Sequence, residues 1–135
     1  KNIIQAAYLQ GKYLFTHAGV SKTWLDSTGY DGSKIDDYLN NLLIHEGKHF
    51  NFKNILYGDN YGDNVEQGPL WIRPNSLEKN CIDYTHVVGH TSLDHIKITD
   101  KVIYTDALAS KEYLVIEDDG LTIKTVKEWY KGTFQ

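Results

Sequence analysis

The sequence predicts an α+β fold in which a mixed sheet ends in an antiparallel meander. Apolar side chains recur at helical spacing in two stretches, which predicts helices over residues 2–10 and 33–46. Runs rich in Val, Ile, Tyr and Thr predict short strands in the second half of the chain, at residues 85–92, 95–99, 101–105, 112–117 and 121–126. Asp118-Asp119-Gly120 predicts the hairpin between the last two strands.

The first half of the chain alternates these elements with glycine-rich turns. Gly11 ends the first predicted helix, and Tyr13–Thr16 is a short apolar strand that runs into His17. Asp31 or Ser33 is expected to cap the helix over residues 33–46, and Gly47 to close it. Residues 47–68 have the polar composition of loops, and no linker divides the single unit expected for residues 1–135.

The composition bounds the kind of protein. The chain has 135 residues, of which 41% are hydrophobic, enough for one domain with one core. A net charge of -4 argues against a nucleic-acid partner, and no apolar run approaches the roughly 18 residues of a membrane span. Cys81 is the only cysteine, so we expect no internal disulfide and a cytoplasmic location.

The absence of methionine is a further compositional feature. The chain starts at Lys1, inside the first predicted helix. We therefore expect that it was processed, cut or excised from a longer polypeptide.

Three side chains are candidates for chemistry. His17 and His90 each stand at the end of a predicted strand beside a glycine, where an ion or ligand can approach. Imidazole is a common metal ligand, although a hydrogen-bonded structural role is the alternative for each histidine. Arg73 lies in a Trp-Ile-Arg-Pro segment, and its guanidinium suits either two phosphate oxygens or a surface ion pair.

Four segments resemble motifs of the calcineurin-like metallophosphoesterases, in the order in which that family has them. Phe15–Ser21 resembles the family's His-Ala-Gly segment, and Pro69–Pro74 resembles its Leu-Trp-x-Arg segment. Val87–Thr91 resembles its Val-Val-Gly-His-Thr segment, and Ile103–Asp106 resembles the strand before its closing meander. The resemblance covers about residues 12–126. It is strongest to bacterial and phage serine/threonine phosphatases and to diadenosine tetraphosphatases.

This resemblance implies a fold and an active site. The fold is an α/β/β/α sandwich, of which this chain would form the C-terminal half. The resemblance implies that His17 and His90 bind one of two divalent metal ions (Mn, Fe, Zn or Ni), that Arg73 binds the substrate phosphate, and that Asp106 is structural near the site. Such a metal pair activates water for attack on phosphorus, which makes the expected activity that of a phosphatase, a metal-binding hydrolase.

Other family segments do not occur in the sequence. The Asp-x-His, Gly-Asp-x-x-Asp-Arg-Gly and Gly-Asn-His-Glu segments, which supply the remaining ligands, are missing, and Ala107 stands where the family often has glycine. Because two imidazoles alone are a poor site for a divalent ion, we expect the isolated chain to bind metal weakly and to be inactive. We also expect exposed apolar surface, covered by an N-terminal fragment of the same protein, by self-association or through a strand edge.

Several functions remain open on the sequence alone. The substrate of a phosphoesterase would be a phosphorylated protein or a nucleotide, the latter as a dinucleoside polyphosphate. A non-catalytic binding or regulatory module that keeps the fold is the alternative from another class. A carbohydrate-binding module is a third, suggested by ten tyrosines and three tryptophans.

Overall fold

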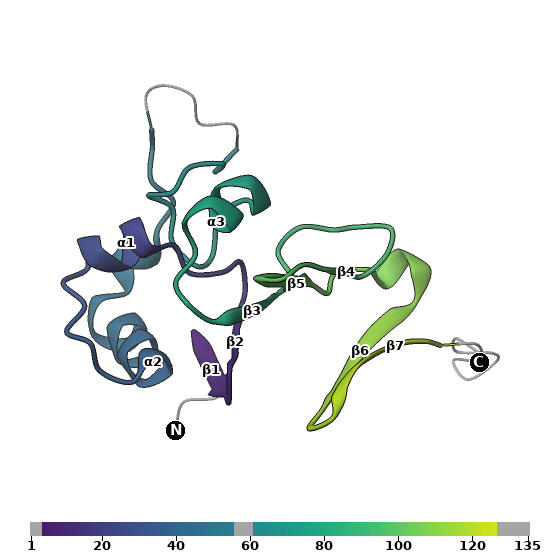
Figure 1. The fold of residues 1–135 in the computed structure, drawn as a ribbon. Coiled ribbons are helices and arrows are strands. Elements are labelled where there is room, and N and C mark those ends of the chain that lie inside the picture. The colour runs from purple at the N-terminus through teal and green to yellow at the C-terminus, as the bar shows by residue number, and fades with distance from the viewer. Residues whose placement is uncertain (1–3, 56–60, 127–135) are drawn as a thin grey trace, which may run out of the picture.

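The computed structural model describes residues 4–55 and 61–126, and these form an α+β fold with two separate sheets (Figure 1). The larger sheet has the order β1-β2-β3-β5-β4, and its strands span Ala7–Gln10, Tyr13–Thr16, Thr85–Val88, Val102–Tyr104 and Lys97–Ile98. The smaller sheet is a hairpin of β6 and β7, at Glu112–Glu117 and Gly120–Thr125. Helices α1, α2 and α3 span Lys22–Ser27, Ile35–Glu46 and Pro74–Asn80, and 3₁₀ turns cover Gly47–Phe50 and Leu108–Ser110.

The centre of the larger sheet is parallel. β2 pairs with β3 and β3 with β5 in parallel, whereas β1 and β4 pair antiparallel at the two edges. The predicted mixed sheet is therefore confirmed. Because β2 and β3 point the same way, they end at the same edge of the sheet, and the residues that follow them meet there.

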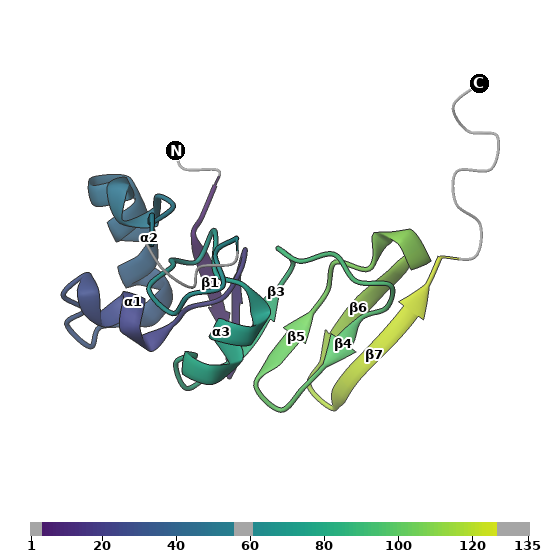
Figure 2. The same cartoon turned by 90° about the horizontal axis from the view of Figure 1, so that it is seen from above.

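Helices α1 and α2 and the β6–β7 hairpin lie at opposite ends of the molecule. α1 and α2 lie beside β1 and β2, whereas β6 and β7 lie beyond β3, next to β4 and β5 (Figures 1 and 2). Trp24 of α1 is fully buried, stacks edge-on against Phe50 at a centroid distance of 5.3 Å, and donates its indole N–H to the carbonyl of His49. The burial of these two large rings anchors the helical end.

Strand β1 overturns the helix predicted for residues 2–10. Residues 7–10 are a strand, and residues 4–6 are not helical; residues 1–3 lie outside the described part. A tight turn at Gly11, whose φ is +58°, returns the chain so that β1 pairs with β2. Helix propensity is a weak preference, and the pairing with β2 together with the burial of Ala7 outweighs it.

Helix α2 covers the outer edge of β1 with polar side chains. The Oδ1 atom of Asn40 accepts hydrogen bonds from the backbone N–H groups of Ala6 and Ala7, at 2.7 and 3.0 Å, and its amide donates to the carbonyl of Ala7. The carboxylate of Asp36 accepts from the N–H of Leu9 at 3.1 Å. These bonds satisfy groups that an edge strand otherwise offers to another chain.

Substitution of Asn40 by alanine is expected to lower the free energy of unfolding by about 2 kcal/mol, because it leaves part-buried backbone groups of β1 without partners. Urea unfolding followed by circular dichroism measures this loss. The matched control is Asn41→Ala on the exposed side of the same helix, which should change stability by less than about 0.5 kcal/mol. Equal effects of the two substitutions would contradict the assigned role of Asn40.

The other helices differ from the sequence prediction at their starts. α2 begins at Ile35 after Lys34, so neither Asp31 nor Ser33 caps it, although it ends before Gly47 as predicted. Asp31 instead accepts the N–H of Ser33 in the preceding turn, at 3.0 Å. α1 and α3 were not predicted, because six and seven residues are too few for a helical period to emerge.

The prediction that the last strands form one antiparallel meander in a single sheet is wrong. β4 and β5 pair with each other, and β6 and β7 form the hairpin at Asp118-Asp119-Gly120 as predicted, but the two pairs belong to different sheets. Lys111, in the left-handed conformation with φ +56°, turns the chain before β6. The hairpin then packs Leu114 and Ile116 against Val87 and Ile103 of the larger sheet. Burial of this apolar face outweighs further edge pairing.

The described residues contain no helix with the length and apolar character needed to cross a membrane.

Candidate functional site

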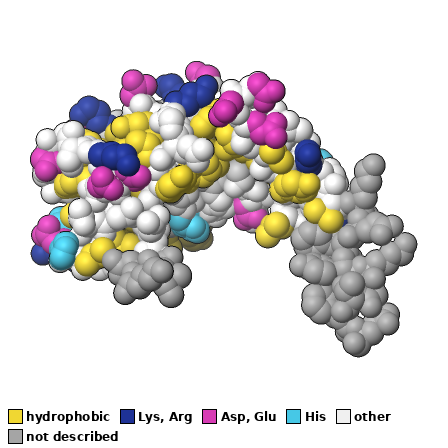
Figure 3. Space-filling view, turned by 90° about the horizontal axis from the view of Figure 1, so that it is seen from below, with side chains coloured by type: hydrophobic (Ala, Val, Ile, Leu, Met, Phe, Trp, Pro, Cys, Tyr) yellow, Lys and Arg dark blue, Asp and Glu magenta, His cyan; other side chains and the backbone are white. Residues whose placement is uncertain are grey.

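His17 and His90 lie in contact at the end of the parallel strands. His17 directly follows β2, and His90 follows β3 after Gly89. The Nε2 atom of His17 is 2.9 Å from the Nδ1 atom of His90, and the ring centroids are 4.8 Å apart. His17 is exposed and His90 half-buried. Figure 3 shows histidine side chains at the surface of the molecule among hydrophobic ones.

Backbone hydrogen bonds fix the two segments that carry the histidines. The carbonyl of His17 accepts from the N–H groups of both Gly89 and His90, each at 3.0 Å. The N–H of Ala18 donates to the carbonyl of Pro69 at 2.7 Å, which ties the same segment to the chain before Trp71. The positions of both imidazoles are therefore set by the sheet and its neighbouring loop.

The surroundings of His90 favour its neutral form. Burial lowers the pKa of His90, and the nearby His17 and Arg73 lower it further, while a hydrogen bond from the ring to the Trp71 carbonyl opposes them. This pattern fits a neutral His90 ring that donates to the carbonyl of Trp71. A neutral imidazole with an oriented lone pair is the form that binds a metal ion.

Arg73 lies close enough to His90 for its charge to act on that ring. It stands immediately before α3, and its backbone N–H donates to the carbonyl of Gly62 at 3.3 Å. Its side chain lines a pocket of about 270 Å³ together with Tyr61, Asp63 and Asn75. No histidine lines this pocket, so the link between Arg73 and the histidine pair is the charge of Arg73 acting on His90.

Asp63 organises the start of α3 beside Arg73. Its Oδ1 atom accepts hydrogen bonds from the backbone N–H and the hydroxyl of Ser76, at 3.0 and 2.7 Å. Hydrogen bonding to Ser76 is the main cause that lowers the pKa of Asp63. A carboxylate from the loop that precedes α3 thereby performs the capping that Arg73, at the N-cap position, does not provide.

Asp106 holds the loop that follows His90. Its carboxylate accepts the hydroxyl of Ser92 at 2.7 Å, and its carbonyl accepts the N–H of Leu93 at 2.8 Å. Asp106 makes these contacts from the segment after β5. It therefore supports the chain next to His90 through contacts with this loop.

The histidine pair fits part of a metal site. Two nitrogens that bind one ion at about 2.1 Å lie about 3.0 Å apart when they subtend a right angle at it. The 2.9 Å between His17 Nε2 and His90 Nδ1 is a hydrogen-bond distance at which one ring donates to the other, and it is also close to this right-angle spacing. Within residues 4–55 and 61–126, no group of three or more His, Cys, Asp or Glu side chains is arranged to hold an ion. Within these residues the pair therefore has no third side chain beside it that could complete a metal site.

Aromatic side chains beside the histidines were not assigned a role from the sequence. Trp71 packs edge-on against Phe52 at a centroid distance of 5.2 Å and lies 6.5 Å from the ring of His90. Both side chains keep large exposed fractions, 42% for Trp71 and 39% for Phe52. The signal available in the sequence was an aromatic residue two positions before Arg73, next to a glycine-rich loop.

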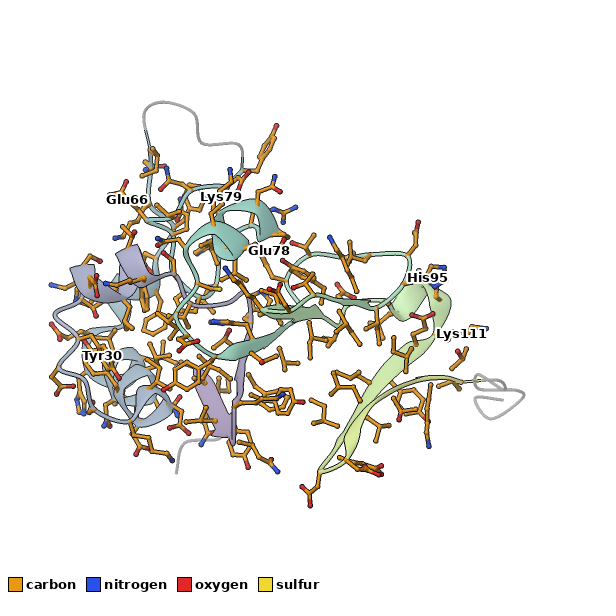
Figure 4. The ribbon with its side chains drawn as sticks, in the orientation of Figure 1. Tyr30, Glu66, Glu78, Lys79, His95 and Lys111 are labelled. Atoms are coloured by element: carbon orange, nitrogen blue, oxygen red, sulfur yellow. The ribbon has the colours of Figure 1, made fainter. Side chains whose placement is uncertain are left out.

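The remaining histidines lie elsewhere. His95 is exposed beside the hairpin, where its Nδ1 atom is 2.8 Å from the carboxylate of Glu112 (Figure 4). His86 is buried in β3. His45 is exposed near the end of α2, and His49 lies in the 3₁₀ turn that follows.

Comparison of the chain with known protein families, with curated proteins and with solved structures finds no match.

Proposed function

We propose that this chain carries part of the active site of a metal-dependent phosphoester hydrolase. The observation that supports the proposal is the 2.9 Å contact between two imidazole nitrogens from neighbouring strand ends, with the charge of Arg73 beside them. Neutral imidazoles bind divalent transition metals, and a guanidinium binds phosphate oxygens. Their convergence at one edge of a parallel sheet is also where open α/β sheets bind ligands.

In this proposal each side chain has a defined task. His17 and His90 would hold a divalent ion, and the hydrogen bond to the Trp71 carbonyl would orient the ring of His90. Arg73 binds two oxygens of the phosphate and orients it at the site. A bound divalent ion supplies Lewis acidity and an activated water. Asp106 keeps the loop after His90 in place through Ser92.

The proposal extends to the protein around the site. By resemblance to the metallophosphoesterases, further ligands would come from Asp-x-His, Gly-Asp-x-x-Asp-Arg-Gly and Gly-Asn-His-Glu segments, which do not occur in this sequence, and the sheet would be part of an α/β/β/α sandwich. We therefore expect the isolated chain to bind metal weakly and to hydrolyse little or nothing. A cytoplasmic location remains an expectation from the single cysteine.

Linked binding of metal and phosphate tests the proposal. Isothermal titration of the chain with Zn²⁺, alone and with inorganic phosphate present, should show that each ligand tightens the binding of the other, because they share one site. His17→Ala and His90→Ala should each weaken Zn²⁺ binding by about tenfold or more, since each removes one of two described ligands. Arg73→Gln should weaken phosphate binding.

His45→Ala serves as the matched control, because His45 is an exposed histidine on α2, outside the histidine pair. It should leave Zn²⁺ affinity unchanged. Zn²⁺ affinity that is insensitive to His17 and His90, or metal and phosphate that bind independently, would overturn the proposal. Rapid hydrolysis of p-nitrophenyl phosphate by the isolated chain would instead refute only the expectation that its site is incomplete.

A further inference from the structure

The loop between β3 and β4 lies along the segment that leads from β5 into the hairpin. The loop covers residues 89–96 and contains His90, and the facing segment covers residues 105–112. Hydrogen bonds join them ahead of β6: Ser92 and Leu93 donate to Asp106, and Ser110 donates to the carbonyl of Asp94. The two segments are therefore bonded to each other over most of their length.

Glu112, at the start of β6, completes this contact with both oxygens of its carboxylate. Its Oε2 atom lies 2.8 Å from Nδ1 of His95, and its Oε1 atom accepts the backbone N–H of Ile96 at 2.8 Å. The side chain of Glu112 is 14% exposed, whereas that of His95 is 74% exposed. The carboxylate is thus held in place by two donors, while the imidazole is accessible to protons from the solvent.

This contact lies at the open end of the hairpin. Lys111, in the left-handed conformation, turns the chain directly before Glu112, and its carbonyl accepts the N–H of Val126 at 2.9 Å. Glu112 itself is paired with Thr125 of β7. The bond between Glu112 and His95 therefore connects the open end of the hairpin to the loop between β3 and β4 (Figure 4).

We propose that His95 and Glu112 form a pH-dependent latch that holds the hairpin to the loop between β3 and β4. The latch is closed while the imidazolium and the carboxylate are both charged, because a hydrogen bond between two ions is about twice as strong as one between neutral groups. It loosens when either group loses its charge. The inference does not depend on the proposed function, since neither residue belongs to the histidine pair of His17 and His90.

The groups around the latch favour its closed form at mildly acidic pH. The hydrogen bond to Glu112 and the charge of that carboxylate raise the pKa of His95 above 6.5, and Asp94 raises it further. The hydrogen bonds from His95 and from the Ile96 N–H lower the pKa of Glu112. The latch is therefore closed between these two pKa values and opens as the pH rises through that of His95.

The other charged groups near the latch are two lysines. Lys111 directly precedes Glu112 in the chain. Lys97 follows in β4, and its ammonium lies over the ring of Tyr104 at 5.8 Å from the centroid. Thr125, which faces Glu112 from β7, carries no charge. His95 is thus the group near this contact whose charge changes around neutral pH.

Proton NMR and amide hydrogen exchange on the full chain between pH 5 and 8 test the latch. Titration of the histidine ring protons should give His95 a pKa above 6.5. The exchange rate of the Ile96 amide, corrected for intrinsic chemistry, is divided by that of the His86 amide, which donates to the Lys101 carbonyl in the centre of the sheet. This ratio removes changes in global stability, and it should rise about threefold from pH 5 to pH 8.

Two variants assign the change to the latch. Glu112→Gln keeps an acceptor for the Ile96 N–H but carries no charge, so the exchange ratio should become independent of pH. The matched control is Glu46→Gln, which removes a carboxylate 3.8 Å from Nε2 of His49, three residues away in sequence. This control should keep the full threefold change. A pKa of His95 at or below 6.5, a ratio constant with pH, or a pH dependence that persists in Glu112→Gln would overturn the latch.

Discussion

Replacement of Gly19 by alanine is expected to lower the free energy of unfolding by about 3–4 kcal/mol, which combines backbone strain with overpacking. Gly19 has φ +107°, a conformation that alanine adopts only at a cost. A Cβ atom there would lie 2.5 Å from Cδ1 of Leu77, a side chain that is fully buried in the core. Denaturant unfolding measures the loss, and because Gly19 is two residues from His17, Zn²⁺ affinity should fall with it.

Gly32→Ala separates strain from overpacking. Gly32 has φ +84°, yet a Cβ atom added there meets nothing within 4 Å. This control should cost only about 1–2 kcal/mol. The double substitution Gly19→Ala and Leu77→Ala should lower the free energy of unfolding by less than the sum of the two single substitutions. The reason is that the cavity left by Leu77→Ala receives the methyl group of Gly19→Ala. Strict additivity, or equal costs at Gly19 and Gly32, would contradict the steric explanation.

The position of Gly19 illustrates which parts of the fold local sequence patterns predict. Strand β2, helix α2 and the β6–β7 hairpin follow from apolar periodicity and turn residues close in sequence. The choice of partner does not follow from such patterns. Residues 7–10 became a strand because β2 was available beside them, and the β6–β7 hairpin packed on the face of the sheet because its apolar side matched Val87 and Ile103.

The candidate site shows the same division. The juxtaposition of His17 and His90 follows from two strands that each end on a histidine, once those strands pair in parallel. The contacts of Trp71 depend on the path of the loop that precedes α3, which no sequence period specifies. Arg73 takes its position because α3 starts directly after it. The side chain that caps α3 is Asp63, ten residues before Arg73 in the sequence. Such contacts between loops were beyond prediction from a single sequence.

Acid is expected to destabilise the fold through His86. This residue lies in β3 between Leu14 and Val102 and is fully buried, with Nε2 2.9 Å from the carbonyl of Ile82. Within the described part of the chain, its buried Nδ1 atom has no hydrogen-bond partner. Burial lowers the pKa of His86 below its usual value of 6.5. The unfolded chain therefore binds more protons below pH 6.5, and stability should fall there by up to about 1.4 kcal/mol per pH unit.

Unfolding in urea between pH 5 and 8 measures this dependence, and two substitutions assign it. His86→Leu should reduce the slope below pH 6.5 whatever its effect on overall stability, because the fully buried imidazole is gone. The half-buried His90, whose pKa is also lowered, keeps a smaller slope. His95→Gln should remove a contribution with the opposite pH dependence. Glu112 raises the pKa of His95, so the pair contributes its full stabilisation below pH 6.5. This contribution is lost as the pH rises through the pKa that His95 has in the folded protein. The acid slope should persist in His95→Gln. An acid slope unchanged in His86→Leu would show that another group is responsible.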